Sequence, residues 1–205
     1  MYEYGLVSIG SHTGFWLQPE FKRFNKKKNI LIEPVPYNII ELKENTKSYD
    51  NIIIEESAIS DKDELIPFYF IKRNSIGKLK KHWASGIGSF SKSHILNHRN
   101  KRFLVSESDI ECINIKCLSF ESLVKKYSIK KIDHLILDVE GSEYKILKSI
   151  NLNQIIIKEI FFEKKHFDGL FKEGKKLEEI KQKLLENNYL LEDKDKENML
   201  AKLKS

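Results

Sequence analysis

The chain has 205 residues, 40% of them hydrophobic and 32% charged, with only nine glycines and four prolines, which excludes a disordered or fibrous protein and predicts one globular domain over residues 1–205. Its net charge of +6 comes mainly from lysines in runs such as Lys26 to Lys28, and because such runs are usually solvated, charge alone does not favour nucleic-acid binding. No apolar run approaches the length of a membrane span, and the first ten residues carry neither a basic leader nor a cleavage site, so we expect a cytoplasmic protein with no membrane partner.

Short apolar runs with strand character alternate with helical runs along most of the chain. Such alternation predicts parallel strands joined by right-handed crossovers, with helices on both faces of the sheet. The strand runs are nearly continuous in apolar residues, as in Leu-Ile-Leu-Asp-Val, which is typical of a central sheet buried on both sides. The predicted class is therefore α/β, with strands at residues 4–9, 30–33, 51–59, 132–139 and 155–163 and helices at 15–24, 37–47, 143–150 and 177–187.

Two pairs of runs lie outside this alternation. Residues 65–71 and 110–118 are expected to be strands on either side of a long insert, and residues 189–191 and 199–203 to close the sheet with an antiparallel terminal hairpin. The insert, at about residues 72–102, is basic, because no acidic residue occurs between Glu64 and Glu107. Its cationic residues are Lys72, Arg73, Lys78, Lys80, Lys81, Lys92, Arg99, Lys101 and Arg102.

A glycine-containing turn follows the first predicted strand. Gly10 and Gly14 allow a tight turn and a close approach of the backbone to a ligand. The next strand ends in Glu33, about twenty residues on, where an acid of a nucleotide-binding fold accepts hydrogen bonds from ribose hydroxyls. The middle glycine of a dinucleotide motif is missing and Ser11 and His12 are bulkier, which favours a ligand without a pyrophosphate, such as S-adenosylmethionine, over NAD.

A cluster of acids follows the predicted strand at 132–139. Asp138, Glu140 and Glu143 surround Gly141, at the edge of the sheet where open α/β folds bind ligands. By parity, Asp138 and Glu140 share one face if the strand continues that far, and Glu143 is expected to stabilise the start of the next helix. The alternative is that the whole cluster is a helix cap.

Taken in order, these motifs resemble the FkbM family of methyltransferases. The resemblance rests on Ser-Ile-Gly-Ser-His-Thr-Gly, Ile-Glu-Pro with Glu44-Asn45 behind it, Ala-Ile-Ser-Asp, and Leu-Asp-Val-Glu-Gly-Ser-Glu. It implies a Rossmann-like class I methyltransferase fold with S-adenosylmethionine over the first strands. Gly10 and Gly14 would line the methionine part, Glu33 the ribose, and Ser60 or Asp61 the adenine side. The first motif usually opens with an acid, whereas this chain has Ser8.

The resemblance also implies O-methylation of a sugar or small-molecule hydroxyl. A base would help to remove the hydroxyl proton, and Asp138, Glu140 and His166 are the candidates; His166 follows Glu163 at the end of the strand at 155–163. Asp138 can instead only bind the cofactor. Two other classes stay open: a non-catalytic cofactor-fold protein or basic binding module, which Ser8 favours, and a nicotinamide-dependent oxidoreductase, which the missing glycine disfavours.

The basic insert has two possible interpretations. Its stretch from Trp83 to Phe90 combines glycines with aromatic residues, so it can be a lid that favours an anionic acceptor, or a disordered solvated loop. His94 and His98 lie four apart and can meet on one helix face, but no Asp, Glu or Cys is near them in the sequence. We therefore expect no metal site there.

Overall fold

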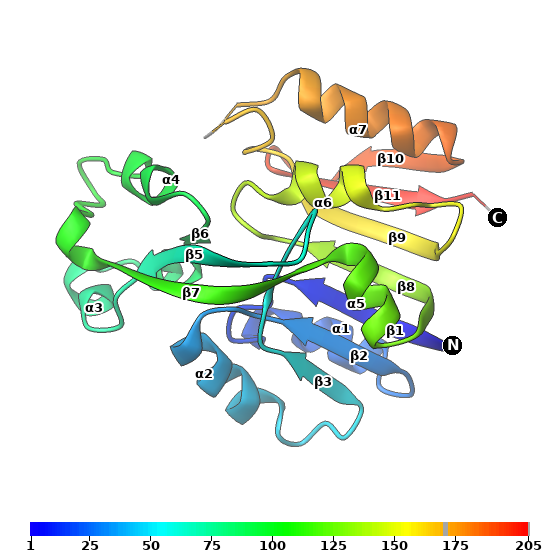
Figure 1. The fold of residues 1–205 in the computed structure, drawn as a ribbon, viewed down its shortest axis with the longest axis horizontal. Coiled ribbons are helices and arrows are strands. Elements are labelled where there is room, and N and C mark those ends of the chain that lie inside the picture. The colour runs from blue at the N-terminus through cyan, green and yellow to red at the C-terminus, as the bar shows by residue number, and fades with distance from the viewer. Residues whose placement is uncertain (170–171, 205) are drawn as a thin grey trace.

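A seven-stranded sheet forms the centre of the computed structural model, which describes residues 1–169 and 172–204 (Figure 1). Its order is β10-β11-β9-β8-β1-β2-β3; β11 is antiparallel to both neighbours, and the pairs from β9 to β3 are parallel. The predicted mostly parallel sheet and its terminal hairpin are confirmed. The strands are β1 (Tyr2–Ile9), β2 (Lys28–Ile32), β3 (Ile52–Glu55), β8 (Ile129–Leu137), β9 (Ile156–Glu163), β10 (Tyr189–Asp193) and β11 (Asn198–Leu203).

Helices cover both faces of this sheet, as predicted. Along β1, Leu6 packs with Phe21 and Leu42 on one face, and Val7 packs on the opposite face with Leu123 and Ile146. The first face is covered by the 3₁₀ turn η1 (Phe15–Leu17), α1 (Gln18–Arg23) and α2 (Pro36–Thr46), and the second by α5 (Phe120–Lys126), α6 (Glu143–Ser149) and α7 (Lys175–Glu186). Burial on both faces explains why the strands read as apolar runs. None of the helices in residues 1–169 and 172–204 is long and apolar enough to cross a bilayer.

A second sheet crosses the carboxyl-end side of the first (Figure 1). Its order is β4-β7-β5-β6, built from β4 (Ala58–Ser60), β5 (Glu64–Ile71), β6 (Gly88–Ser89) and β7 (Ile110–Ser119). The single strand predicted at 51–59 is wrong, because β3 belongs to the first sheet and β4 to the second. Polar residues at 55–57 break the run: the Glu55 carboxylate accepts hydrogen bonds of 2.5 Å from Lys126 Nζ and from the Tyr127 hydroxyl.

The basic insert is a folded unit between β5 and β7. The two strands that flank it are antiparallel neighbours, and Ile71 is paired with Ile110 where the chain leaves and re-enters the sheet. Inside the insert, Ala84, Ile95 and Phe103 are fully buried in a hydrophobic cluster of their own. A disordered loop is therefore the wrong interpretation. The elements between the two strands are α3 (Ser75–Leu79), η2 (His82–Gly86), β6, α4 (Lys92–Asn97) and η3 (Glu107–Asp109).

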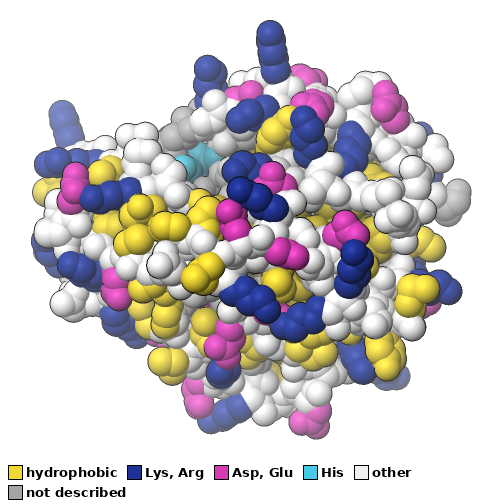
Figure 2. All heavy atoms as spheres, in the orientation of Figure 1, with side chains coloured by type: hydrophobic (Ala, Val, Ile, Leu, Met, Phe, Trp, Pro, Cys, Tyr) yellow, Lys and Arg dark blue, Asp and Glu magenta, His cyan; other side chains and the backbone are white. Residues whose placement is uncertain are grey.

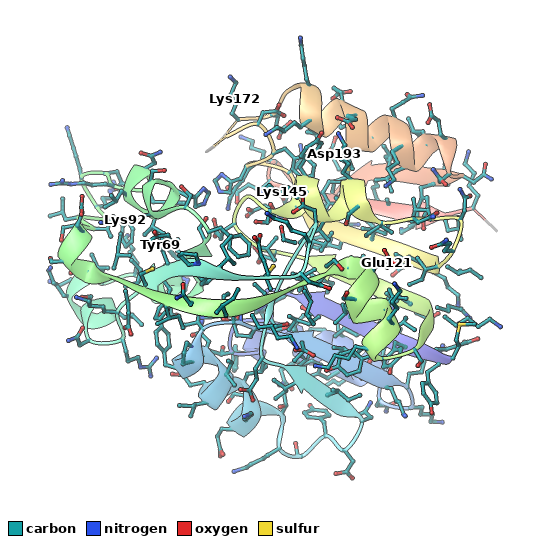
Figure 3. The ribbon with its side chains drawn as sticks, in the orientation of Figure 1. Tyr69, Lys92, Glu121, Lys145, Lys172 and Asp193 are labelled. Carbon is teal, nitrogen blue, oxygen red and sulfur yellow. The ribbon has the colours of Figure 1, made fainter. Side chains whose placement is uncertain are left out.

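Acids from outside the insert neutralise part of its charge. Arg73 pairs with Glu41, and Lys92, labelled at the left of Figure 3, pairs with Glu107. Lys78 Nζ lies 2.7 Å from Oδ1 of the buried Asp109, whose pKa is held well below its usual value by hydrogen bonds from Lys78 and Ser106 that outweigh its burial. Ion pairs thus hold the basic insert to α2 and to η3, the turn that leads into β7.

Candidate active site

The carboxyl ends of β1, β2 and β8 meet at one edge of the central sheet, where the insert closes over them. A cavity of about 580 Å³ lies between these strand ends and the insert, within the range of small-molecule binding sites. It is lined by Gly10, His12, Thr13, Phe15, Trp16, Glu33, His82, Trp83, Gly86, Ile87, His98, Asp138, Glu140 and Lys165.

Gly10 forms the tight turn at the end of β1. Its φ is +83°, and a Cβ added there would lie 1.8 Å from the backbone oxygen of Asp138. Only glycine meets both constraints, so the backbone of the turn reaches the floor of the cavity. Gly14 has a φ of +71° and a Cβ there would lie 2.6 Å from Leu42 Cδ1; it allows the turn to pack on α2, but it does not line the cavity.

Glu33 follows β2 and faces the same cavity. Its side chain is buried and accepts hydrogen bonds from the backbone N–H groups of His12, at 2.8 Å, and Val35, at 3.0 Å, and from Asn38 Nδ2, at 3.3 Å. Burial raises the pKa of Glu33 to about 7, although these hydrogen bonds oppose the rise. A carboxylate has about four acceptor positions, so three donors leave capacity for a ligand hydroxyl.

Ser60 and Asp61 lie away from this cavity. Ser60 is buried on β4 and donates a hydrogen bond of 3.0 Å to Asp61 Oδ1. Ala58 and Ile59, just before them, line a narrower pocket of about 40 Å³ that shares Gly10, Glu33 and Asp138 with the larger cavity. The apolar walls of this pocket also include Pro34, Val35, Phe68 and Phe90.

Ser8 is fully buried on β1 and lines neither of these two cavities. Its backbone oxygen accepts a 3.0 Å hydrogen bond from Ser11 Oγ, which in turn accepts one of 3.1 Å from the Ile32 N–H. Ser8, which replaces the family's usual acid, therefore lies where β1 is joined to β2 and not in the cavity lining.

The acidic cluster after β8 forms a turn. The predicted shared strand face of Asp138 and Glu140 is wrong, because β8 ends at Leu137 and Glu140 has a φ of +53°. Glu143 is buried and accepts hydrogen bonds of 2.9 Å from the N–H groups of Val139 and Gly141, which holds the turn at the start of α6. Burial raises the pKa of Glu143 to about 8.

Asp138 and Glu140 nevertheless both line the cavity. Asp138 is solvent-accessible, yet partial desolvation by the cavity walls and, after it, the charge of Glu140 raise its pKa to about 6. Such a carboxylate is ionised at neutral pH and is still basic enough to accept a proton.

Three histidines surround Glu140. Its Oε2 atom lies 3.3 Å from His94 Nε2, 3.8 Å from His98 Nε2 and 3.6 Å from His166 Nε2. No acid is near His94 and His98 in the sequence, but the fold brings Glu140 to both of them. Figure 2 shows histidine atoms at the surface in the hollow between the basic insert and the body of the molecule. Burial lowers the pKa of His166 to about 4, so its ring is neutral at pH 7.

Several residues of the site carry no signal in the sequence. Lys165 contributes to the cavity wall, and its Nζ lies 2.5 Å from Glu163 Oε1 and 3.0 Å from Glu197 Oε2 on the terminal hairpin. Phe15 and Trp16 are exposed and line the cavity together with Trp83.

The chain is similar to known methyltransferases in sequence pattern and fold. The family model of the methyltransferase FkbM domain matches residues 8–191. The fibrillarin pre-rRNA processing protein of Methanococcus jannaschii, at 13% identity and a TM-score of 0.51, is covered over 68% of its chain and 100% of this one, which supports the fold. Precorrin-6y C5,15-methyltransferase of Geobacter metallireducens aligns at 9% identity and a TM-score of 0.48, over 81% of its chain and 98% of this one. No curated protein sequence matches the chain.

The cavity fits the cofactor of this family. The backbone of Gly10 lines the cavity, and the buried carboxylate of Glu33 faces the cavity with remaining capacity to accept a hydrogen bond. Since the family model covers most of the chain, this protein belongs to the FkbM family of methyltransferases, and its cofactor is S-adenosylmethionine.

Proposed function

We propose that this methyltransferase acts on a hydroxyl group of a sugar or another small molecule. The observation that supports this is the position of Asp138, a solvent-accessible carboxylate that lines the same cavity as Gly10 and Glu33. Its pKa of about 6 suits a base that works near neutral pH. Bound S-adenosylmethionine supplies a methyl group already activated on a sulfonium.

Residues at the ends of β1 and β2 would each bind a different part of the cofactor. Glu33 would accept hydrogen bonds from the ribose, and the backbone at Gly10 would lie under the methionine part. The apolar residues beside them would contact the adenine more directly than Ser60 and Asp61, because Ala58 and Ile59 line the narrow pocket that adjoins the larger cavity. Ser60 and Asp61 would then support that wall from β4.

Asp138 is the proposed proton acceptor. As the acceptor oxygen forms its bond to the methyl carbon and the carbon–sulfur bond breaks, the hydroxyl proton passes to the Asp138 carboxylate. Glu140 suits this role less well than Asp138 because three imidazoles surround its carboxylate. His166 suits it less well because its side chain is only 1% exposed. Aromatic residues at the rim, Trp16 and Trp83, would cover the acceptor and exclude water.

An anionic acceptor is the second part of the proposal. Lys165 is the lysine in the cavity lining, whereas the nine cations of the basic insert lie outside that lining. Their attraction would therefore act on the approach of an acidic or phosphorylated sugar, because Lys165 inside the cavity is already paired with Glu163 and Glu197. Such steering makes the rate of acceptor binding sensitive to ionic strength.

The test is transfer of a radiolabelled methyl group to a panel of neutral, acidic and phosphorylated sugars. Asp138→Asn is the test variant. The matched control is Asp50→Asn, which removes an exposed acid. We expect Asp138→Asn to lower kcat by about 10²- to 10⁴-fold, with little change in cofactor affinity, and the control to behave as wild type. Methylation of amines or carbon acids but of no hydroxyl would refute the proposed acceptor. Full activity of Asp138→Asn would refute the proposed base.

A binding module without catalysis remains the competing class. Its sequence support was Ser8, and that residue lies outside the lining of both cavities. Cofactor binding without transfer to any acceptor in the panel would favour it.

A further inference from the structure

Four potential metal ligands converge beside the cavity. His94 comes from α4 on the insert and His98 from the residue that caps the end of α4. Glu140 comes from the turn after β8, and His166 from the segment after β9. One ligand atom from each of these residues lies within 4.8 Å of every other. The four side chains come from three separate segments, so the fold alone brings them together.

Their spacing is close to that of a tetrahedral metal site. Zinc binds histidine nitrogen and carboxylate oxygen at about 2.0 to 2.2 Å, which places tetrahedral ligand atoms about 3.3 Å apart. Glu140 Oε2 lies 3.3, 3.6 and 3.8 Å from the Nε2 atoms of His94, His166 and His98. Small side-chain rotations would therefore bring all four onto one ion.

The orientation of His98 suits a metal ligand. Its Nδ1 atom lies 3.0 Å from the backbone oxygen of His94, and because a carbonyl only accepts, Nδ1 carries the proton. In the singly protonated ring, the lone pair is then on Nε2, the atom that lies 3.8 Å from Glu140 Oε2. An Nδ1–H bond to a carbonyl is the usual support of a metal-binding histidine.

Burial and backbone conformation also set this cluster apart from surface histidines. The side chains of His94, His98, Glu140 and His166 are 12%, 9%, 17% and 1% exposed. Glu140 adopts a left-handed conformation, with a φ of +53°, which side-chain-bearing residues seldom adopt and which is often found at functional sites. The two N–H groups held by Glu143 fix that turn.

We propose that His94, His98, His166 and Glu140 bind one divalent transition-metal ion, with zinc as the preferred ion. Three imidazoles and one carboxylate favour zinc and its neighbours over magnesium or calcium, which prefer all-oxygen sites. The ion would join the basic insert to two loops at the edge of the central sheet. Since His98 and Glu140 also line the cavity, it would lie next to the acceptor space, in addition to the methyl-transfer function proposed above.

Direct metal binding tests this inference without any substrate. The full chain is stripped with a chelator, titrated with Co²⁺ at pH 7.5 while the visible spectrum is recorded, and then titrated with Zn²⁺ in competition. We expect one equivalent of Co²⁺ with the intense visible bands of a four-coordinate ion, displacement by one equivalent of Zn²⁺, and a higher Tm for the zinc-loaded chain.

Two variants separate the site from nonspecific binding. His98→Ala is expected to weaken Zn²⁺ binding by more than the about 10- to 100-fold that loss of a supporting group costs. His82→Ala removes an exposed cavity histidine outside the cluster and is the matched control for metal affinity. Absence of Co²⁺ or Zn²⁺ binding by folded wild-type chain would overturn the inference in favour of a hydrogen-bonded histidine–carboxylate network. Equal losses in the two variants would also overturn it, and the wild-type titration decides the matter if His98→Ala does not fold.

Failure of this inference is distinguishable from failure of the proposed function. A chain that binds no metal but methylates a hydroxyl refutes only the metal site. A chain that binds one metal ion but transfers no methyl group refutes only the proposed reaction.

Discussion

The backbone N–H of His12 donates a 2.8 Å hydrogen bond to Glu33 Oε2, which joins the turn after β1 to the end of β2. The His12 ring continues this link, because its Nε2 lies 2.8 Å from Ser85 Oγ on the insert. Asn38 forms a parallel connection, since its Nδ2 donates to both Glu33 Oε1 and the Ser85 backbone oxygen. One hydrogen-bond network therefore connects Glu33 to Ser85 of the insert, which closes over the cavity.

Replacing Glu33 tests its assignment to the ribose. Glu33→Gln keeps the size of the side chain but removes its charge, and a hydrogen bond to a charged group contributes about 1.5 to 3 kcal/mol. We expect the Kd for S-adenosylmethionine to rise by about 10- to 100-fold, measured by calorimetric titration. Glu44→Gln, at an exposed position on α2, is the control and should bind as wild type. Unchanged affinity in Glu33→Gln would rule out the ribose assignment.

The raised pKa of Glu33 predicts a pH dependence of cofactor binding. Because burial places this pKa at about 7 and ribose hydroxyls donate to the ionised form, affinity should be highest above pH 7 and weaken as the pH falls through it. If only the ionised form binds, Kd rises by about tenfold per pH unit below 7. Titrations between pH 5.5 and about 8.5 measure this slope. Glu33→Gln should remove it, and an equal slope in the variant would assign the effect to another group.

Gly10 is expected to tolerate no side chain. In Gly10→Ala the new Cβ meets the Asp138 backbone oxygen, and the left-handed conformation alone costs about 1 to 2 kcal/mol. Thermal unfolding should show a clear loss of stability, and cofactor binding should be abolished. Gly77→Ala is the matched control, because nothing lies within 4 Å of its added Cβ and the residue is inside α3. A Gly10→Ala chain as stable as Gly77→Ala would contradict the geometry of the turn.

Asp109 should contribute to the stability of the basic insert. Its buried carboxylate accepts hydrogen bonds from Lys78 Nζ, Ser106 Oγ and the Ser106 N–H, at 2.7, 2.6 and 3.0 Å. Asp109→Asn is expected to lower the free energy of unfolding by about 1.5 to 3 kcal/mol in denaturant titrations, whereas the exposed Asp50→Asn should not. Because the pKa of Asp109 is lowered from 3.8, its contribution is present above that pH and is lost as the pH falls below it. A variant as stable as wild type at pH 7 would show that the ion pair is not required.

The parts of the site that follow from local sequence were predictable. Gly10 and Glu33 each follow an apolar strand run, and parallel strands bring their carboxyl ends to one edge of a sheet, so the pattern alone places both residues at the cavity. Asp138 was predictable for the same reason. Its raised pKa was not, since that depends on the walls of a cavity formed by the insert.

The histidine cluster was not predictable because it depends on long-range packing. His94 and Glu140 are separated by 46 positions, and no local pattern encodes the placement of α4 beside the turn after β8. The division of residues 51–59 between two sheets has a similar cause. Glu55 is bound by Lys126 and Tyr127, at the end of α5 and far along the chain, so the residues that end β3 are not its sequence neighbours.

The pairing of Ile71 with Ile110 has a consequence for how the molecule can vary. Paired residues on neighbouring strands are about 5 Å apart, so the chain departs for the insert and returns at nearly the same point. Segments of other lengths can replace residues 72–109 without changing the strand order of the seven-stranded sheet, and in the second sheet only the edge strand β6 would be affected. The central sheet can therefore keep its topology while the segment over the cavity varies, provided that the contacts of Ser85 with His12 and Asn38 are kept or replaced.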